Sequence, residues 1–283
     1  MMAPLTLPSP AKLNRMLHIV GRRKDGYHSL QTLFQFIDLC DHLTLTPRHD
    51  GQVQLTSEVD GVDHDDNLVV RAAKLLQRHS GTSLGATLSI EKQLPMGGGL
   101  GGGSSNAATT LVGLNQLWQL HLPLETLAEL GLQLGADVPV FVHGHSAWAE
   151  GIGEQLSAVT LDTPWFVLIH PGISVSTPAV FQDPQLTRDS RPITMARALQ
   201  GGASEWRNDC EAVVKERYPP IAEALDWLTQ HAPSRLTGTG ACVFAAFETQ
   251  QAAQATAYLA AERWSTWVAR GLNTSPLHDA LGG

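Results

Sequence analysis

Residues 94–106 read LPMGGGLGGGSSN, and this stretch decides how the rest of the sequence is interpreted. Six of the seven residues from Gly97 to Gly103 are glycine. Such a run is unfavourable in chain entropy, but it is useful where the backbone must approach a ligand closely or adopt a positive φ. The next three residues, Ser-Ser-Asn, open a predicted helix, whose free N–H groups and positive end favour an anion. The stretch therefore predicts a phosphate-binding loop.

Three other interpretations of the glycines are weaker. A flexible linker is disfavoured, because a strand is predicted over 86–91 and a strong helix follows the glycines at once. A P-loop requires GxxxxGK[ST], and no lysine follows this run. A dinucleotide-binding GxGxxG match at Gly97, Gly99 and Gly102 is nearly automatic here, and the required acid about 20 residues on is missing. The nearest candidate, Glu125, begins a predicted helix, which argues against a nicotinamide-dependent oxidoreductase.

The remaining sequence interleaves strands and helices, which predicts an α+β fold. The sequence pattern changes near Gly153, which predicts two domains, 1–153 and 154–283. Helical spacing of apolar residues predicts helices at 67–79, with Asp65 or Asp66 as N-cap, and at 107–118, 124–134, 221–231 and 250–262. Extended patterns predict strands at 13–20, 33–39, 42–46, 86–91, 138–142, 146–150, 165–170 and 266–272. Residues 236–247 are predicted to run through the glycine turn at 238–240 into a buried strand.

The composition excludes several classes of protein. The 283 residues carry a net charge of −8, which disfavours a nucleic-acid scaffold but leaves room for a local anion pocket. The apolar stretches are far shorter than a membrane span, and the N-terminus has no continuous apolar segment of the kind found in secretory signals. Three widely spaced cysteines form no CxxC motif. We therefore expect a cytoplasmic protein with reduced thiols and no membrane, nucleic-acid or obligatory protein partner.

Two clusters invite a metal assignment, and neither has the right pattern. His143 and His145 lack nearby cysteine, glutamate or HExxH context, so a zinc site is not expected. The acidic cluster at 63–66 lacks EF-hand spacing and is interpreted as a solvated helix cap rather than a calcium loop. No metal ligand can be named from spacing alone.

Five motifs in order resemble one superfamily, the galactokinase, homoserine kinase, mevalonate kinase and phosphomevalonate kinase (GHMP) superfamily. The resemblance covers residues 9–276, nearly the whole chain. GRRKDGYHSLQTLFQ and GADVPVF are most similar to the branch that phosphorylates 4-diphosphocytidyl-2-C-methyl-D-erythritol in the non-mevalonate isoprenoid pathway. The motifs are SPAKLN (9–14), GRRKDGYHSLQTLFQ (21–35), PMGGGLGGGSSNA (95–107), GADVPVF (135–141) and LTGTGACVF (236–244).

The resemblance implies a fold and a reaction. The fold is a two-domain GHMP kinase, with an N-terminal ATP-binding α/β domain containing a left-handed crossover, an exception to the usual handedness. The C-terminal domain is a ferredoxin-like α/β sandwich. The reaction is ATP-dependent transfer of the γ-phosphoryl group to the 2-hydroxyl of the methylerythritol unit, with Mg²⁺ as cofactor. Ser104 or Ser105 is expected to contact the ion, and ATP phosphates and water to supply its other ligands.

Two charged residues are the candidates for the chemistry. Lys12 is the only charged residue before Arg15 and stands in an apolar strand, although a solvated edge position is an alternative. Asp137 lies between small and apolar residues, so it is expected to be partly buried and to need a partner, although a turn or N-cap aspartate is an alternative. With the resemblance, we expect the two to pair, with Asp137 accepting the hydroxyl proton and Lys12 orienting it and offsetting negative charge.

The resemblance also implies binding residues. Tyr27 offers a ring to stack on a pyrimidine, and His28 offers a donor and an acceptor for its edge. Phe181 is expected on the other side of the base. The full set expected at ATP is Asn67, Lys92, Pro95, Met96, Gly97, Gly98, Gly99, Leu100, Gly101, Gly102, Gly103, Ser104, Ser105 and Asn106. The full set expected at the acceptor substrate is Asn14, Tyr27, His28, Asp137, Thr177, Pro178, Phe181, Thr239 and Gly240.

Two alternatives within the fold remain at this point. Another GHMP kinase, of the homoserine or mevalonate type, would need no ring to stack on a base, so Tyr27 and His28 argue against it. A nucleotide-binding module without catalysis would not need both Lys12 and Asp137.

Overall fold

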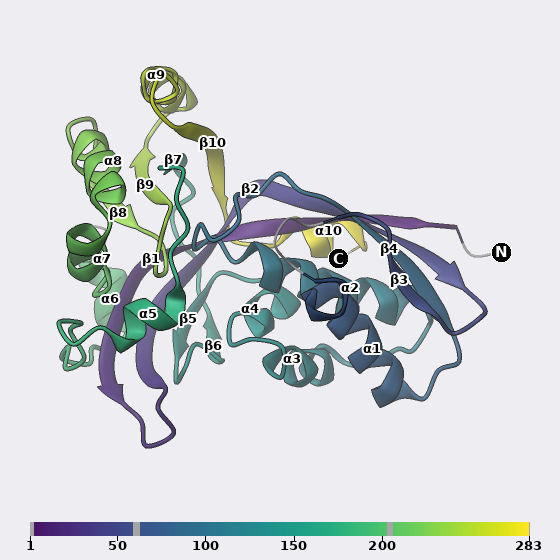
Figure 1. Cartoon of the computed structure of the whole chain (residues 1–283). Helices are drawn as coiled ribbons and strands as arrows, with labels where there is room; N and C mark the ends of the chain where they lie inside the picture. Colours follow the sequence, from purple (N-terminus) through teal and green to yellow (C-terminus); the bar gives the residue numbers. More distant parts are fainter. Residues whose placement is uncertain (1–2, 59–62, 203–205, 283) are drawn as a thin grey trace.

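A computed structural model describes residues 3–58, 63–202 and 206–282. Ten strands in these residues form one sheet in the order β3-β4-β2-β10-β7-β9-β8, and β1 and the β5–β6 hairpin also pair with β2 (Figure 1). The strands are β1 (Leu5–Arg22), β2 (His28–Arg48), β3 (Val53–Leu55), β4 (Gly85–Glu91), β5 (Ala147–Glu150), β6 (Gln155–Ala158), β7 (Trp165–His170), β8 (Ser234–Leu236), β9 (Val243–Phe247) and β10 (Ser265–Leu272). The helices are η1 (His64–Asp66), α1 (Leu68–Ser80), α2 (Gly102–Leu117), α3 (Leu124–Leu132), α4 (Val138–His143), α5 (Thr177–Gln182), α6 (Met195–Gly201), α7 (Glu211–Arg217), α8 (Pro219–Thr229), α9 (Gln250–Ala260) and α10 (Pro276–Ala280).

The antiparallel hairpin of β1 and β2 runs through both halves of the molecule (Figure 1). Its register passes from Leu5 opposite Leu45 to Arg22 opposite His28, with a shift where Pro10 pairs with Cys40 but the next residue pairs with Ile37. This bulge breaks the alternation, which is why the pattern predicted two strands, 33–39 and 42–46, where the structure has one. β1 contributes to every apolar cluster of the described core, so its central residues lie between the two halves.

The N-terminal half packs helices α1, α2, α3 and α4 against one face of the sheet (Figure 1). Helix α2 is surrounded by the other elements and is buried along almost its whole length, from Ser105 to Leu114 and at Leu117. β3 and β4 pair in parallel and are connected through α1, which is the crossover connection of this half. The glycine run precedes α2, so burial of this helix fixes where the run lies.

The C-terminal half has the order β7-α5-α6-α7-α8-β8-β9-α9-β10, and its strands are arranged antiparallel as β10-β7-β9-β8, with α8 and α9 as the two helices that pack on the sheet. This is the βαββαβ arrangement of ferredoxin-like folds, as predicted. Its core joins the inner faces of the sheet and helices, including Val167, Leu225, Val243 and Ala257. Two residue pairs, including Gly271 with Ile37, connect β10 to β2 and make the sheet continuous between the halves.

Two local predictions were wrong. Residues 138–142 were expected as a strand but form most of helix α4. A short apolar run does not separate a strand from a buried helix, and Pro139 is suited to a first helical turn but lacks the N–H that a central strand uses. The N-cap of α1 is Asn67, whose side chain accepts from Val69 N, whereas Asp65 and Asp66 form the preceding 3₁₀ turn.

The connection between the halves is made by several segments. Gly153 lies between β5 and β6, which together form a hairpin on β2. Near the C-terminal end, α10 returns to the N-terminal half, where Leu277 is part of the core. Among the described residues, none of the helices is both long and apolar enough to cross a bilayer.

Candidate active site

A cavity of about 1170 Å³ lies where the two halves meet. It exceeds the roughly 300–1,000 Å³ of most small-molecule pockets, which leaves room for two substrates. Of the predicted site residues, Ser105 and Gly240 do not line it. Those that do are Lys12, Asn14, Tyr27, His28, Asn67, Lys92, Pro95, Met96, Gly97, Gly98, Gly99, Leu100, Gly101, Gly102, Gly103, Ser104, Asn106, Asp137, Thr177, Pro178, Phe181 and Thr239.

The glycine run packs directly against the second glycine turn of the chain. The backbone carbonyls of Gly97 and Gly98 accept from Ala241 N at 2.9 Å and from Cys242 N at 3.1 Å. Gly99 has a φ of +72°, and a Cβ added there would lie 2.3 Å from the carbonyl oxygen of Thr237. Only glycine accommodates both constraints. The close packing holds the loop in one conformation without covering its cavity face.

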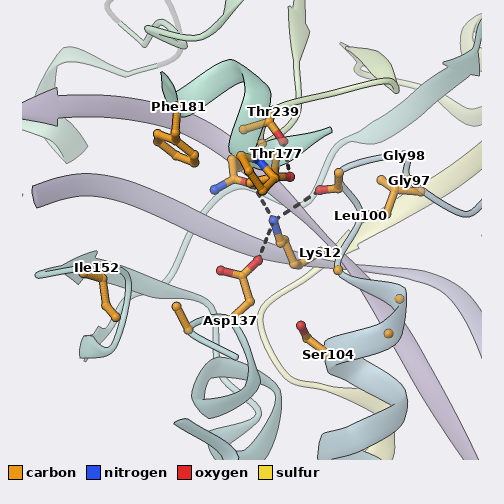
Figure 2. Close-up of a pocket in the computed structure, with 18 of the residues that line it drawn as sticks. Lys12, Gly97, Gly98, Leu100, Ser104, Asp137, Ile152, Thr177, Phe181 and Thr239 are labelled. Atoms are coloured by element: carbon orange, nitrogen blue, oxygen red, sulfur yellow. Dashed lines mark hydrogen bonds and ion pairs between the residues drawn. The ribbon is translucent and has the colours of Figure 1, made fainter. Parts of the chain in front are cut away.

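The start of α2 is built to hold an anion. Its N-cap is Gly101, so no side chain caps the helix, and its first turn contains no acidic residue. The first N–H groups of a helix have no partner inside it, and the helix dipole makes this end positive. Ser104 lies at this end and faces the cavity (Figure 2). Phosphate is the ligand class that such a helix end binds.

We predict that Gly99→Ala lowers stability. The new methyl group meets backbone rather than a mobile side chain, and positive φ is unfavourable for alanine, so a loss of about 1–3 kcal/mol is expected. Thermal unfolding measures this loss. Gly103→Ala is the matched control, because its Cβ would meet nothing nearer than Leu68 Cδ1 at 3.5 Å. An unchanged Tm for Gly99→Ala would contradict the packing argument.

Lys12 lies in the cavity wall with a 4% exposed side chain (Figure 2). Its ammonium group lies 2.6 Å from Asn14 Oδ1, 3.2 Å from the Gly99 carbonyl oxygen and 3.2 Å from Asp137 Oδ2. The expected pairing with Asp137 is therefore confirmed. Three oxygen partners stabilise the buried cation, which joins the glycine loop to the carboxylate.

Asp137 immediately precedes α4, yet its carboxylate does not cap that helix. Its side chain is 34% exposed and faces the cavity, with one oxygen directed at Lys12 (Figure 2). A carboxylate beside a buried cation, reachable from the cavity, can accept a proton from a bound hydroxyl. The alternative of a purely capping aspartate does not describe this geometry.

Polar contacts hold Lys12 in place. Asn14 N donates to Thr237 Oγ1 at 3.1 Å, and Asn14 Nδ2 donates to Thr32 Oγ1 at 2.9 Å. These bonds leave Asn14 Oδ1 pointing at the ammonium group. Above them, Thr177 Oγ1 and Thr239 Oγ1 are 2.7 Å apart and tie α5 to the second glycine turn (Figure 2).

An aromatic wall closes the end of the cavity away from the glycine run. The rings of His28 and Phe181 are stacked, with centroids 5.2 Å apart and planes at 25°. Burial and the nearby cations Arg188 and Arg22 lower the pKa of His28, so its ring is neutral at neutral pH. Tyr27 lines the same part of the cavity and is 59% exposed. Flat rings next to a neutral imidazole suit a heterocyclic base.

A second lysine lies beside the helix end. Lys92 Nζ pairs with the fully buried carboxylate of Asp41, which also accepts from Asn106 Nδ2 at 3.0 Å. The other oxygen of Asp41 accepts from the backbone N–H groups of Gln93 and Leu94. Asp41 thus anchors the strand end that leads into the glycine run. Sequence reasoning included Lys92 and Asn106 but missed Asp41, which stands in a strand without a motif around it.

Other residues at the candidate site were also missed. Thr32 and Phe34 of β2 lie beside the site, and Lys12 Nζ is 5.3 Å from the Phe34 ring centroid. These two residues could have been predicted from the alternation of side chains in QTLFQF, because β2 pairs with the strand that carries Lys12. Arg188, which contacts His28, stands in a polar loop with no signal in sequence. Ser105 was expected at ATP, but its hydroxyl is buried without a hydrogen-bond partner in the described residues, because it faces the core side of α2.

Comparison with known proteins identifies the family of this chain. Residues 67–145 match the GHMP kinases N terminal domain, and residues 191–265 match the GHMP kinases C terminal domain. A 4-diphosphocytidyl-2-C-methyl-D-erythritol kinase from Chromohalobacter salexigens is 62% identical over 99% of this chain and 95% of its own length. A crystal structure of 4-(cytidine 5'-diphospho)-2C-methyl-D-erythritol kinase superposes with a TM-score of 0.83, at 30% identity, over 94% of this chain and 99% of that one.

The fold extends to more distant enzymes. A crystal structure of mevalonate kinase superposes with a TM-score of 0.71 at 12% identity, over 95% of this chain and 99% of that one, which shows a shared fold. The match to the first relative covers nearly the whole chain. This chain belongs to the GHMP kinases and, within them, to the 4-diphosphocytidyl-2-C-methyl-D-erythritol kinases.

Proposed function

We propose that this chain transfers the γ-phosphoryl group of ATP to the 2-hydroxyl of 4-diphosphocytidyl-2-C-methyl-D-erythritol, a step of the non-mevalonate isoprenoid pathway. The observation that carries this proposal is one cavity with two different ends. One end is the uncapped helix start beside the glycine run, and the other is the stacked pair His28 and Phe181. Lys12 and Asp137 lie between them, where a phosphate donor and a hydroxyl acceptor would meet.

The proposed reaction uses few protein groups. Asp137 accepts the proton of the substrate 2-hydroxyl, and the oxygen of that hydroxyl forms a bond to the γ-phosphorus. The bond from the γ-phosphorus to the bridging oxygen of ADP breaks, and ADP leaves with that electron pair. Lys12 holds the carboxylate and offsets the negative charge between the two substrates. The backbone N–H groups at the start of α2 bind the donor phosphates.

We propose that Mg²⁺ accompanies ATP. Among residues 3–58, 63–202 and 206–282, no three His, Cys, Asp or Glu side chains converge on a metal site. Magnesium keeps several water ligands and binds mainly through substrate phosphates, so the proposed ion requires few protein ligands. Ser104, which lines the cavity at the helix start, is the side chain proposed to contact the ion, and the bound ion would neutralise phosphate charge.

We assign the binding residues by end of the cavity. Asn67, Lys92, Asn106 and residues 95–104 are proposed for the ATP end. Asn14, Thr177, Pro178 and Thr239 are proposed to border the path of the acceptor. Gly240 is proposed to act through the turn that carries Thr239, because it does not line the cavity.

We also propose that residues 1–153 form the ATP-binding unit and residues 154–283 the acceptor unit, sharing the β1–β2 hairpin.

A cytoplasmic location is proposed from the thiols. Cys40, Cys210 and Cys242 are all free and buried. Burial raises the pKa of the Cys40 and Cys210 thiols to about 12, so neither is reactive at neutral pH.

The test of the reaction is ADP release from magnesium-ATP, measured with the cytidyl substrate beside mevalonate and homoserine. Release with the cytidyl substrate alone is expected, with one new phosphomonoester per ADP in ³¹P NMR. Release with mevalonate or homoserine instead would retain the phosphate loop and overturn the base pocket. Absence of release with all three, from folded protein, would favour a module that binds nucleotide without catalysis.

We predict that Tyr27→Ala raises KM for the cytidyl substrate roughly 10-fold, since stacking of one base is worth about 1–3 kcal/mol. KM for ATP and the Tm should be unchanged, because this side chain is 59% exposed and forms no part of the glycine run. Tyr258→Ala is the matched control, since Tyr258 is 76% exposed on α9 outside the cavity. Equal losses for both substrates would show that Tyr27 supports the fold instead.

A further inference from the structure

Arg188 connects the aromatic wall to the loop that follows α5. Its Nε donates to His28 Nε2 at 3.0 Å, across 160 residues of sequence. Its two terminal nitrogens donate to backbone carbonyls, those of Leu186 at 3.0 Å, Phe181 at 2.9 Å and Asp183 at 2.7 Å. Every guanidinium nitrogen therefore has an acceptor. Arg188 therefore holds the backbone of Phe181 and also contacts His28, whose ring is stacked on the Phe181 ring.

The contact determines the protonation of His28. A guanidinium group has only donors, so the ring nitrogen it meets must be an acceptor. A neutral imidazole that accepts at Nε2 carries its proton on Nδ1. None of the described residues forms a hydrogen bond with Nδ1, and the ring lines the cavity. Arg188 on one side and Arg22 of β1 are the charged groups acting on this ring, and both oppose a second proton.

We propose that Arg188 is a positioning residue, which keeps His28 neutral with its proton on Nδ1 and so makes His28 a hydrogen-bond donor to an acceptor atom of the pyrimidine. The pyrimidine part of this inference rests on the proposed function. Cytosine offers N3 and O2 as acceptors, whereas its amino group can only donate. The opposite tautomer would present a bare Nδ1 to the same atoms and leave a buried acceptor unpaired, which is unfavourable.

The first test needs no substrate. In protein labelled with ¹⁵N-histidine, long-range ¹H–¹⁵N spectra distinguish the two tautomers and the imidazolium, and His28→Gln assigns the signal. We expect the Nδ1–H form of His28 between pH 6 and 8. Arg188→Met should produce a mixture of tautomers and a higher pKa of His28, because it removes both a donor and a nearby cation. An Nε2–H ring in the unaltered protein would overturn the proposal, even if Arg188→Met does not fold.

The matched control alters the same loop without touching His28. Arg217 pairs with the buried carboxylate of Asp183, whose backbone carbonyl is one of the acceptors of Arg188. Arg217→Gln should therefore loosen the loop and lower the Tm while the His28 spectrum stays in the Nδ1–H form. A change of tautomer in Arg217→Gln would mean that loop order, rather than the Arg188 contact, sets the protonation of His28.

The second test is kinetic. Arg188→Met should raise KM for the cytidyl substrate about 10-fold, the loss of roughly one hydrogen bond, with kcat and KM for ATP within twofold. Arg188→Lys should recover part of the loss, because a lysine can still donate to Nε2. A lower kcat for Arg188→Met, with KM raised equally for the cytidyl substrate and for ATP, would indicate a structural role and contradict the proposal. If the cytidyl substrate does not react but the spectra are as expected, the proposed reaction is wrong. The proposal that Arg188 sets the protonation of His28 is then still supported.

Discussion

Asp137→Asn is expected to lower kcat by about 10²- to 10⁴-fold, the range for loss of a positioned general base. The amide keeps the shape of the carboxylate but cannot accept the hydroxyl proton. Asp137 does not cap α4, and Lys12 keeps its contacts with Asn14 and the Gly99 carbonyl oxygen when the carboxylate is replaced, so the helix and the glycine run should keep their conformation. Binding of a non-hydrolysable ATP analogue should therefore be unchanged, as measured by calorimetry beside the steady-state kcat.

A remote pair of the same chemistry serves as the control for this substitution. Lys215 Nζ and Asp226 Oδ1 are 2.6 Å apart on the surface of the C-terminal half, away from the cavity. Asp226→Asn removes one charge from an ion pair just as Asp137→Asn does, and kcat should be unaffected. Near-normal turnover by Asp137→Asn would exclude Asp137 as the base.

Lys12→Met is the second large effect, with an expected loss of about 10²- to 10³-fold in kcat, as for removal of one preorganised charge-stabilising group. Methionine fills similar space but leaves the oxygens of Asn14 and Gly99 without the ammonium group that they contact at 2.6 and 3.2 Å. The Tm is also expected to fall, because these partners are left unpaired in a buried setting.

The double variant Lys12→Met/Asp137→Asn tests whether the two residues act as a unit. Groups that share one step are strongly non-additive, so the double variant should be about as slow as the slower single variant. Losses that multiply would mean that Lys12 acts on the phosphates independently of Asp137. A Lys12→Met enzyme with unchanged kcat would remove the cation from the mechanism.

The glycine run carried more information than any other part of the sequence, because its chemistry is local. Free N–H groups at a helix start follow from where the glycines end and the helix begins, so the phosphate loop was predictable without tertiary knowledge. The same reasoning could not choose between Ser104 and Ser105. That choice depends on which face of α2 turns toward the sheet, and the structure buries Ser105.

Residues that meet through pairing of distant strands were harder to predict. The contact of Lys12 with Asp137 was expected only with the help of the resemblance, since 125 residues separate them. The bulge near Pro10 interrupts the alternation in β2, so its full length was not predicted. The apolar run 138–142 matched the patterns of both a strand and a buried helix. Arg188 reaches His28 from a loop, where no periodicity exists to place it.

A crystal structure with a non-hydrolysable ATP analogue and the cytidyl substrate tests the central claim most directly. The account predicts the donor phosphates at the start of α2, the pyrimidine beside His28 and Phe181, and the 2-hydroxyl within about 3 Å of an Asp137 carboxylate oxygen, the reach of a hydrogen bond. A complex in which the pyrimidine lies away from these rings, or in which Asp137 contacts no substrate hydroxyl, would contradict it.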